Sequence, residues 1–248
     1  MEGYDVYQDI SERTEGCIYI GVVGPVRTGK STFIKRFMDL LVLPNMDNEF
    51  KRERTRDELP QSANGKTIMT TEPKFVPNEP IELTLRENAK FKVRLVDCVG
   101  YLVEGAMGHM EDNSPRMVNT PWFEDRIPFE EAAEIGTRKV IADHSTIGLV
   151  VTTDGSITDL PRRSYIEAEE RVIKELKELD KPFIVALNSA RPKAQETIEL
   201  REALETKYNT PVMIIDALKM EMDDLEGILG KILFEFPAKE INFHIPRW

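Results

Sequence analysis

One short glycine-containing segment constrains the fold of this chain more than any other feature of the sequence. The segment spans residues 24–31, reads GPVRTGKS, and directly follows the apolar run Ile18–Val23. Apolar residues at helical spacing then continue over Ser31–Leu41. The segment matches the pattern G-x-x-x-x-G-K-S/T in full, and its context is the strand, loop and helix that this pattern requires. The chain is therefore predicted to form a phosphate-binding loop within an α/β fold.

The chemistry of phosphate binding explains the spacing within this segment. Glycines let backbone N–H groups turn toward an anion, and the N-terminus of the following helix adds partial positive charge. Lys30 is predicted to bridge the β- and γ-phosphates of a nucleoside triphosphate, and the Ser31 hydroxyl is predicted to ligate Mg²⁺. The predicted nucleotide-binding residues of this region are Gly24, Pro25, Val26, Arg27, Thr28, Gly29, Lys30, Ser31 and Thr32.

A second motif, DCVG at residues 97–100, stands at the end of the apolar run Phe91–Val96. A carboxylate at this position is predicted to hold Mg²⁺ through water, and the glycine frees a backbone N–H to approach the γ-phosphate. The D-x-x-G pattern is weak alone, because it also describes ordinary turns at strand ends. Its combination with the upstream loop favours a role for Asp97 and Gly100 at the nucleotide.

Thr70 and Thr71 lie between the two motifs, in the sequence GKTIMTTEP at residues 65–73. In switch GTPases a threonine between the first helix and the second strand completes the Mg²⁺ shell and senses the γ-phosphate. Either threonine fits this position, and spacing alone does not separate that role from an ordinary loop. The predicted catalytic residues are Lys30, Thr70, Thr71 and Asp97, and the predicted metal ligands are Ser31, Thr71 and Asp97.

The segment expected to bind the base departs from the GTPase pattern. A GTPase of this class reads N-K-x-D after the strand predicted at Phe183–Leu187, and the aspartate accepts hydrogen bonds from guanine. Residues 188–191 here read NSAR. Asn188 remains a predicted nucleotide-binding residue, whereas Arg191 offers donors where acceptors are needed. Guanine preference is therefore predicted to be lost.

The residue after Gly100 is also atypical. Some GTPases carry there a glutamine that positions the attacking water, whereas this chain has Tyr101. The substitution predicts that hydrolysis is slow or that it needs a group from another subunit.

The remaining apolar patterns predict a P-loop NTPase fold of the GTPase-like α/β class. Strand and helix patterns alternate, which implies a mostly parallel sheet with helices on both faces. Ile81–Leu85 and Phe91–Val96 predict one antiparallel hairpin at the sheet edge. The predicted strands are Ile18–Val23, Val93–Val96, Ile147–Thr152, Phe183–Leu187 and Val212–Ile215. The predicted helices are Ser31–Leu41, Phe129–Ala142, Arg162–Leu179, Ala194–Tyr208 and Asp224–Phe234.

Three segments do not fit this alternation. Residues 44–80 and 101–128 show no clear period, and structureless segments of this length are usually functional loops or disorder. Pro237–Trp248 alternates apolar and polar residues, which indicates a strand that enters a following domain. The predicted organisation is one P-loop domain over residues 1–236 and the start of another domain over residues 237–248.

Composition excludes several classes of function. The chain has 248 residues, of which 41% are hydrophobic and 31% charged, and no apolar run approaches the ~18 residues of a membrane-spanning helix. A formal net charge of −11 disfavours electrostatic binding of nucleic acid, so no nucleic-acid partner is expected. Cys17 and Cys98 are expected to be reduced thiols. The N-terminal sequence lacks a signal-peptide pattern, which leads us to expect a cytosolic protein.

With these motifs in place, the chain closely resembles the ATPase domains of the stage IV sporulation protein A family, spore-coat morphogenetic proteins related to translation-factor GTPases. The resemblance covers nearly the whole chain, and its most specific stretch is ELPQSANGKTIMTTEPKFVPN at residues 58–78. Other matching segments are GVVGPVRTGKSTFIKRFMDLLVLPN, RLVDCVGY, EAAEIGTRKVIADHSTIG and YIEAEERVIKELKELDKPF. The family's phosphate-binding lysine maps to Lys30, its Mg²⁺-site aspartate to Asp97, and its sensor threonines to Thr70 and Thr71.

The resemblance implies ATP and Mg²⁺ as cofactors, and ATP hydrolysis that drives self-assembly into a static homo-polymer around the forespore. It implies a peripheral position on the forespore membrane, on the mother-cell cytoplasmic side, and later in the spore coat. It also implies a small amphipathic membrane-anchoring peptide and other spore-coat proteins as partners, largely through regions that follow the ATPase domain.

Two other functions stay open at this point. The first is a regulatory GTPase, which the NSAR sequence at residues 188–191 argues against and which nucleotide competition would test. The second is a scaffold that binds nucleotide without hydrolysing it, with which Tyr101 is consistent. Single-turnover phosphate release would separate this scaffold from an ATPase.

Overall fold

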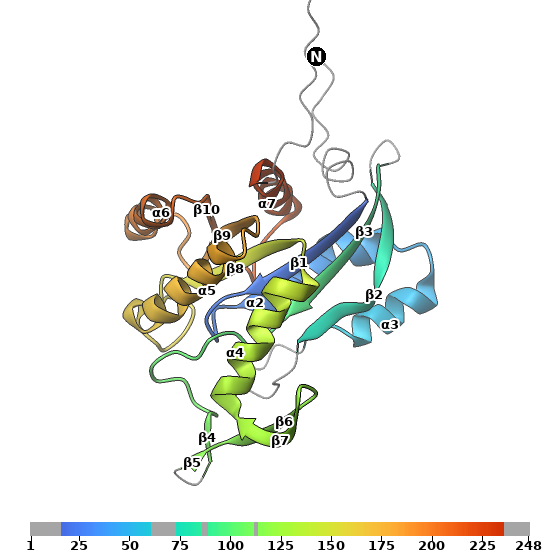
Figure 1. Ribbon diagram of the computed structural model, residues 1–248. Helices are drawn as coiled ribbons and strands as arrows, with labels where there is room; N and C mark the ends of the chain where they lie inside the picture. The colour runs from blue at the N-terminus through green and yellow to red at the C-terminus, as the bar shows by residue number, and fades with distance from the viewer. Residues whose placement is uncertain (1–15, 61–72, 86–88, 112–113, 236–248) are drawn as a thin grey trace, which may run out of the picture.

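A six-stranded sheet runs through the centre of the molecule (Figure 1). The computed structural model describes residues 16–60, 73–85, 89–111 and 114–235. The strands of the sheet are β1 Cys17–Val23, β2 Lys74–Leu85, β3 Ala89–Asp97, β8 Ile147–Thr153, β9 Phe183–Asn188 and β10 Val212–Ile215. They follow the order β10-β9-β8-β1-β3-β2, and all neighbours are parallel except β2 and β3. The predicted parallel sheet with one antiparallel edge pair is confirmed, whereas the strand predicted at Pro237–Trp248 lies outside the described residues.

The position of β1 decides where the loops after the strands meet. β1 lies between β3 and β8, with Val22 opposite Asp97 and Val23 opposite Val150 in the pairing register. Because these strands are parallel, their carboxyl ends reach the same edge of the sheet, which is where open α/β sheets bind ligands. The loop after β1 and the segment after β3 are therefore neighbours.

Helices cover both faces of the sheet, as predicted. They are α2 Lys30–Phe37, α3 Glu49–Asp57, α4 Phe129–Lys139, α5 Ile166–Glu178, α6 Gln195–Tyr208 and α7 Met222–Glu235. One hydrophobic core joins α2 and α7 to the sheet, and a second core joins α5 and α6 to its other face. Figure 1 shows α4 and α5 in front of the strands. Successive residues of β1 serve the two cores in turn, because Val22 belongs to the first core and Val23 to the second.

Buried apolar side chains at helical spacing explain these helices. In α5, Val172, Ile173 and Leu176 are buried, and each contributes roughly 1.5–3 kcal/mol to folding. A 3-10 turn at Arg162–Tyr165 precedes α5, and π-helical turns extend α2 and α4 at their C-terminal ends. Among the described residues, no helix has both the length and the apolar character needed to cross a membrane.

The two long segments without a period contain regular structure, so the expectation of long loops is wrong in part. Residues 44–80 include α3, which begins after Asn48, whose Oδ1 accepts a hydrogen bond from the backbone N–H of Lys51 at 3.0 Å. Residues 101–128 form two small antiparallel sheets. Their strands are β4 Met110–Glu111 with β5 Ser114–Pro115, and β6 Met117–Thr120 with β7 Phe123–Pro128. Such short strands offer too few positions for a periodic pattern.

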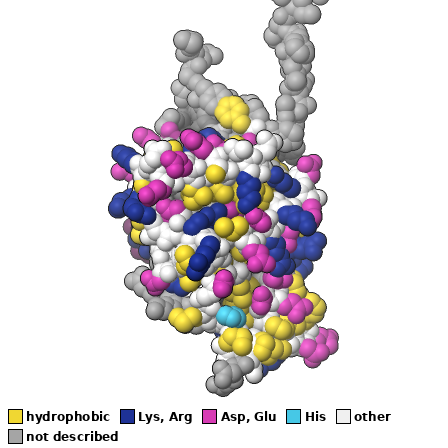
Figure 2. All heavy atoms as spheres, turned by 90° about the vertical axis from the view of Figure 1, so that its left-hand side faces the viewer, with side chains coloured by type: hydrophobic (Ala, Val, Ile, Leu, Met, Phe, Trp, Pro, Cys, Tyr) yellow, Lys and Arg dark blue, Asp and Glu magenta, His cyan; other side chains and the backbone are white. Residues whose placement is uncertain are grey.

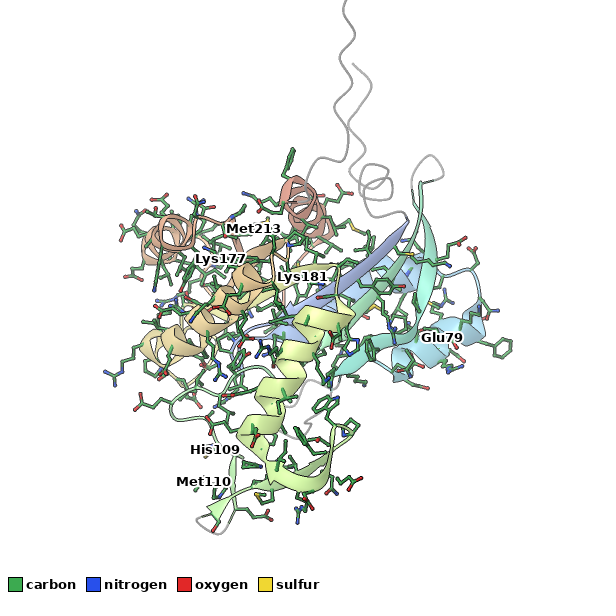
Figure 3. The ribbon with its side chains drawn as sticks, viewed as in Figure 1. Glu79, His109, Met110, Lys177, Lys181 and Met213 are labelled. Atoms are coloured by element: carbon green, nitrogen blue, oxygen red, sulfur yellow. The ribbon has the colours of Figure 1, made fainter. Side chains whose placement is uncertain are left out.

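Apolar side chains gather on the surface of these small sheets, at the lower end of the molecule. We call Met107, Met110, Met117 and Phe123 the methionine patch; their exposed fractions lie between 38% and 49%. Figure 2 shows hydrophobic side chains around a histidine at this end, and Figure 3 labels His109 and Met110 there. Methionine is a flexible side chain that adapts to irregular surroundings.

Candidate nucleotide-binding site

The backbone conformation of the loop between β1 and α2 restricts which residue types can occupy it. Gly24 and Gly29 have φ values of 135° and 92°. A Cβ at Gly24 would lie 2.3 Å from the carbonyl oxygen of Val151, and one at Gly29 would lie 2.3 Å from Nδ2 of Asn188. Both positions therefore need glycine. Arg27 also has a positive φ, 63°, which non-glycine residues seldom adopt. The loop and the first turn of α2 contain Gly24, Pro25, Val26, Arg27, Thr28, Gly29, Lys30, Ser31 and Thr32.

Lys30 and Ser31 begin α2 and reach different partners. The Lys30 ammonium donates to the carbonyl oxygens of Gly24 and Pro25, at 3.2 and 2.7 Å. The Ser31 hydroxyl donates to Oδ2 of Asp97 at 2.8 Å. The structure thus brings together Ser31 and Asp97, which lie 66 residues apart in the sequence and belong to different motifs.

The electrostatics of this cluster fit a bound Mg²⁺–polyphosphate group. Lys30 and Asp97 are only 5% and 8% exposed. Burial lowers the pKa of Lys30 and raises the pKa of Asp97, although the Ser31 hydrogen bond and the Lys30 charge oppose the second effect. In the described part of the chain, Oδ1 of Asp97 is buried without a hydrogen-bond partner. Phosphate oxygens would compensate the ammonium, and a cation beside the Ser31 hydroxyl would compensate the carboxylate.

The segment after β3 lies directly against the phosphate-binding loop. Tyr101 forms a parallel bridge with Pro25, and its carbonyl oxygen accepts a hydrogen bond from the backbone N–H of Val26 at 2.9 Å. The phosphate-binding loop is therefore joined to the segment after β3 through the backbone of Tyr101 as well as through Ser31 and Asp97.

Gly100 lies very close to the backbone of the phosphate-binding loop and to the Lys30 ammonium. Its φ is 89°, and a Cβ there would lie 2.1 Å from the carbonyl oxygen of Gly24 and 2.6 Å from the Lys30 ammonium. A side chain at this position would collide with backbone that cannot move aside, so only glycine is compatible with the closed arrangement.

The side chain of Tyr101 is buried and does not take the place of a water-positioning glutamine. Its hydroxyl donates to Oε2 of Glu175 on α5 at 2.5 Å, and the Arg171 guanidinium carbon lies 4.5 Å from its ring centroid. Arg171 also pairs with Glu134 on α4. The sequence indicates that glutamine is missing at this position, but the partners of Tyr101 are too distant along the chain for any local pattern to predict them.

Asn188 lies behind the phosphate-binding loop and joins it to the segment after β10. Its Nδ2 donates to the carbonyl oxygen of Thr28, and its Oδ1 accepts from the backbone N–H of Ala217, both at 3.0 Å. The side chain is buried, and both amide groups have partners. The arrangement supports a positioning role for Asn188, and direct contact with a nucleotide stays a prediction.

Asp154, which is not among the predicted site residues, organises the segment after Asn188. Its Oδ2 accepts hydrogen bonds from the hydroxyls of Ser189 and Thr197 at 2.6 and 3.1 Å. Its Oδ1 accepts from the backbone N–H of Ser156 at 2.9 Å. Burial acts to raise the pKa of Asp154, but these hydrogen bonds outweigh it and hold the pKa below its usual value. The carboxylate is therefore ionised at neutral pH and fixes the loop after β9.

A local signal for Asp154 was present in the sequence. Asp154 and Gly155 directly follow the buried strand β8, Ile147–Thr153, which is the same strand-end context that identified Asp97. The two backbone N–H groups that follow Ser189 are also bonded within this cluster, because Ala190 donates to the Ser156 hydroxyl and Arg191 donates to the Ser189 hydroxyl, both at 2.9 Å.

Thr70 and Thr71 lie outside the described residues, so their predicted roles stay predictions. Within the described ranges, no three His, Cys, Asp or Glu side chains gather as a metal site. Of the described residues, Ser31 and Asp97 are those placed to hold a cation together with the oxygens of the nucleotide itself.

Replacing Asn188 by alanine is expected to weaken both the fold and nucleotide binding. The change leaves the Thr28 carbonyl and the Ala217 N–H without their partners in a buried position, which costs about 1–3 kcal/mol. Urea unfolding would measure the loss of stability, and titration with a fluorescent nucleotide would measure the loss of affinity. Asn119→Ala is the matched control for the chemical change, since Asn119 is exposed on the short strand β6. Equal stability of the Asn188→Ala variant and the parent would contradict the positioning role.

The family model described as "Stage IV sporulation protein A, ATPase domain" matches residues 1–237. The chain belongs to this family. It is 59% identical to stage IV sporulation protein A of Clostridioides difficile strain 630 over 244 residues, which cover 98% of this chain and 50% of that protein. It is 58% identical to the Bacillus subtilis strain 168 protein and 57% identical to the Bacillus anthracis protein, each over 100% of this chain and 50% of the relative.

The resemblance predicted from the motifs is thereby confirmed, and the chain is a nucleotide-binding ATPase domain of a sporulation protein family. The chain spans about half the length of the curated relatives it matches. A crystal structure of a point variant of SsGBP is similar over 95% of this chain and 65% of that chain, with 15% identity and a TM-score of 0.48.

Proposed function

We propose that this chain hydrolyses ATP in a Mg²⁺-dependent reaction, and that hydrolysis drives self-assembly of the longer protein into a spore-coat polymer around the forespore. One observation carries the chemical part of the proposal. Asp97 presents a buried oxygen that has no hydrogen-bond partner among the described residues, beside the Ser31 hydroxyl and next to a loop that buries the Lys30 ammonium. Among binding sites, this donor set suits a Mg²⁺–triphosphate group.

Each of these residues has a separate task in the proposed reaction. Lys30 would hold and orient the β- and γ-phosphates, while Ser31 and Asp97 would hold the cation. When bound, Mg²⁺ supplies positive charge that stabilises the transferring phosphoryl group. Gly100 would bring its backbone N–H to the γ-phosphate, because the segment after β3 lies against the loop. Thr70 and Thr71 are proposed as the residues that distinguish ATP from ADP, with Thr71 as a further cation ligand.

The choice of ATP over GTP is supported by the segment after β9. Guanine recognition in this class needs a carboxylate that accepts from the ring N–H and the exocyclic amine, and residues 188–191 contain none. Asp154, which contacts this segment through Ser189, already accepts hydrogen bonds from Ser156, Ser189 and Thr197. Among the described residues of this segment, a guanine would therefore find no free carboxylate acceptor.

The proposed partners follow from family membership. They are further copies of the chain, a small amphipathic membrane-anchoring peptide and other spore-coat proteins. The proposed place is the outer surface of the forespore, peripheral to its membrane and on the mother-cell cytoplasmic side, and later the spore coat. Because the chain spans about half of its relatives, regions that follow residue 236 are proposed to make most contacts with the peptide and the coat.

Competition binding and single-turnover phosphate release would test the proposed function. We expect phosphate release from ATP to require Mg²⁺ and to be lost in Asp97→Ala, because the carboxylate acts through the cation. We expect GTP to displace a labelled nucleotide no better than ATP does. A preference for GTP of more than about tenfold would favour a regulatory GTPase, since residues outside 188–191 would then have to recognise guanine. Tight ATP binding without phosphate release would favour the scaffold, with which Tyr101 is consistent.

Assembly is tested in the longer protein, by sedimentation with ATP, ADP and a non-hydrolysable ATP analogue. Thr70→Ala combined with Thr71→Ala is expected to keep ATP binding, because Lys30 remains, and to reduce hydrolysis and sedimentation together. Parental hydrolysis and assembly in this double variant would exclude both threonines as sensors.

A further inference from the structure

Tyr101 links two parts of the molecule that the proposed reaction does not by itself connect. Through its backbone it binds the phosphate-binding loop, since its carbonyl oxygen accepts from Val26 at 2.9 Å and its main chain pairs with Pro25. Through its side chain it binds α5, since its hydroxyl donates to Glu175 at 2.5 Å. One residue therefore ties the segment after β3 to the loop on one side and to a helix on the other.

The side-chain contacts of Tyr101 exceed what core packing requires. A phenyl ring alone would fill the same hydrophobic cluster, yet the ring carries a hydroxyl that reaches a half-buried carboxylate. The Arg171 guanidinium lies over the ring and also contacts Glu175 at 3.7 Å, while its other edge pairs with Glu134 on α4. Burial and the neighbouring Glu175 raise the pKa of Tyr101, so its hydroxyl remains a proton donor. We call these contacts of Tyr101 with Glu175 and Arg171 the anchor, and through the Arg171–Glu134 pair they connect both α5 and α4 to the site.

The anchor has a direct geometric consequence for Gly100, the neighbour of Tyr101. Gly100 is packed so closely against Gly24 and the Lys30 ammonium that a single added carbon would collide with both. A shift of Tyr101 therefore moves Gly100 away from the Lys30 ammonium and changes the place where a γ-phosphate would be held.

We propose that Tyr101 is a positioning residue, which holds the Asp97–Gly100 segment closed on the phosphate-binding loop through its hydrogen bond to Glu175. The effect on ATP turnover rests on the proposed function, whereas the effect on the loop does not. In this arrangement the segment after the D-x-x-G motif is attached to α5 through Tyr101 and is therefore less mobile than a free loop would be. The surface pair of Arg171 and Glu134 holds the other side of the ring and so keeps α4 in register with the same anchor.

Removing the hydroxyl or its acceptor tests the anchor by kinetics. Tyr101→Phe and Glu175→Leu are each expected to lower kcat for ATP about threefold to tenfold, the worth of one buried hydrogen bond, with KM within about twofold of the parent. The double variant is expected to be no slower than the slower single variant, because both changes break the same contact. Glu175→Gln keeps an acceptor oxygen and is the matched control, with kcat close to that of the parent.

Amide hydrogen exchange tests the anchor without reference to hydrolysis. The Val26 N–H is expected to exchange about threefold to tenfold faster in Tyr101→Phe than in the parent or in Glu175→Gln. The Val185 N–H, which donates to the Pro211 carbonyl in the sheet, is expected to keep its rate. Unchanged exchange at Val26, or an equal increase at Val26 and Val185, would overturn the proposal. If the parent releases no phosphate, the proposed function fails, and exchange at Val26 still decides whether Tyr101 holds the loop.

Discussion

The variant Lys30→Ala is expected to lose at least about a hundredfold in ATP affinity, which corresponds to roughly 2.7 kcal/mol. Lys30 carries the one ammonium that the described residues bury within the phosphate-binding loop, so its removal leaves the phosphates without their main side-chain countercharge. Isothermal titration with ATP and Mg²⁺ would measure the loss. The far-ultraviolet circular dichroism spectrum should keep its helical signal, because burial already disfavours the charged lysine in the folded chain.

Lys35→Ala provides a matched control for this experiment. Lys35 lies on the same helix, α2, and is exposed, so its removal changes the net charge equally without touching the loop. We expect this control to bind ATP within about twofold of the parent, because exposed charges are screened. Parental affinity in a folded Lys30→Ala variant would mean that the phosphates bind elsewhere.

The variant Gly100→Ala is expected to release phosphate at least about a hundredfold more slowly than the parent. Its free energy of unfolding is expected to be about 2 kcal/mol lower. The added methyl group would lie 2.1 Å from the Gly24 carbonyl oxygen, and the φ of 89° is itself unfavourable for alanine. Both effects force the segment after β3 away from the loop. Single-turnover assays and urea unfolding would measure the two losses in the same preparation.

Gly227→Ala is the control for the same chemical change. Gly227 lies within α7, where an added methyl group would lie 3.4 Å from the Met213 methyl, an ordinary van der Waals contact. Alanine favours the helix over glycine by about 1 kcal/mol, so this control should be active and at least as stable as the parent. Full activity of Gly100→Ala would show that the closed arrangement around Lys30 is not required for turnover.

Much of the fold was predictable because its signals are local. The buried runs after which Lys30 and Asp97 appear are short and β-branched, and the apolar spacing of residues such as Val172 and Leu176 indicates a helix. The helix α3 and the small sheets of residues 110–128 were not predicted. Charged residues dominate α3, and the strand pairs are too short to show a period. Their structure depends on caps and pairing partners rather than on a buried stripe.

The site, like the fold, contains features with a local sequence pattern, which were predicted, and features without one, which were not. Ser31 and Asp97 were predicted to meet because each belongs to a motif whose place in the fold is known from its neighbours. The attachment of Tyr101 to Glu175 joins residues 74 positions apart, and neither lies in a motif. Asp154 bears the strand-end signal but lacks the pattern that would give the signal a function. Long-range polar contacts of this kind become visible only when the chain is folded.

The methionine patch makes one end of the molecule chemically different from the rest. Peroxide oxidises the thioethers that it can reach, and a methionine sulfoxide is polar where methionine is apolar. The side chains of Met107, Met110 and Met117 are accessible, whereas Met38 and Met220 are buried in the core beneath the sheet. Mild oxidation would therefore turn this surface from apolar to polar before it affects the fold, and methionine sulfoxide reductases would reverse the change. The polarity of this surface would thus depend on the oxidation state of its methionines and not on the nucleotide.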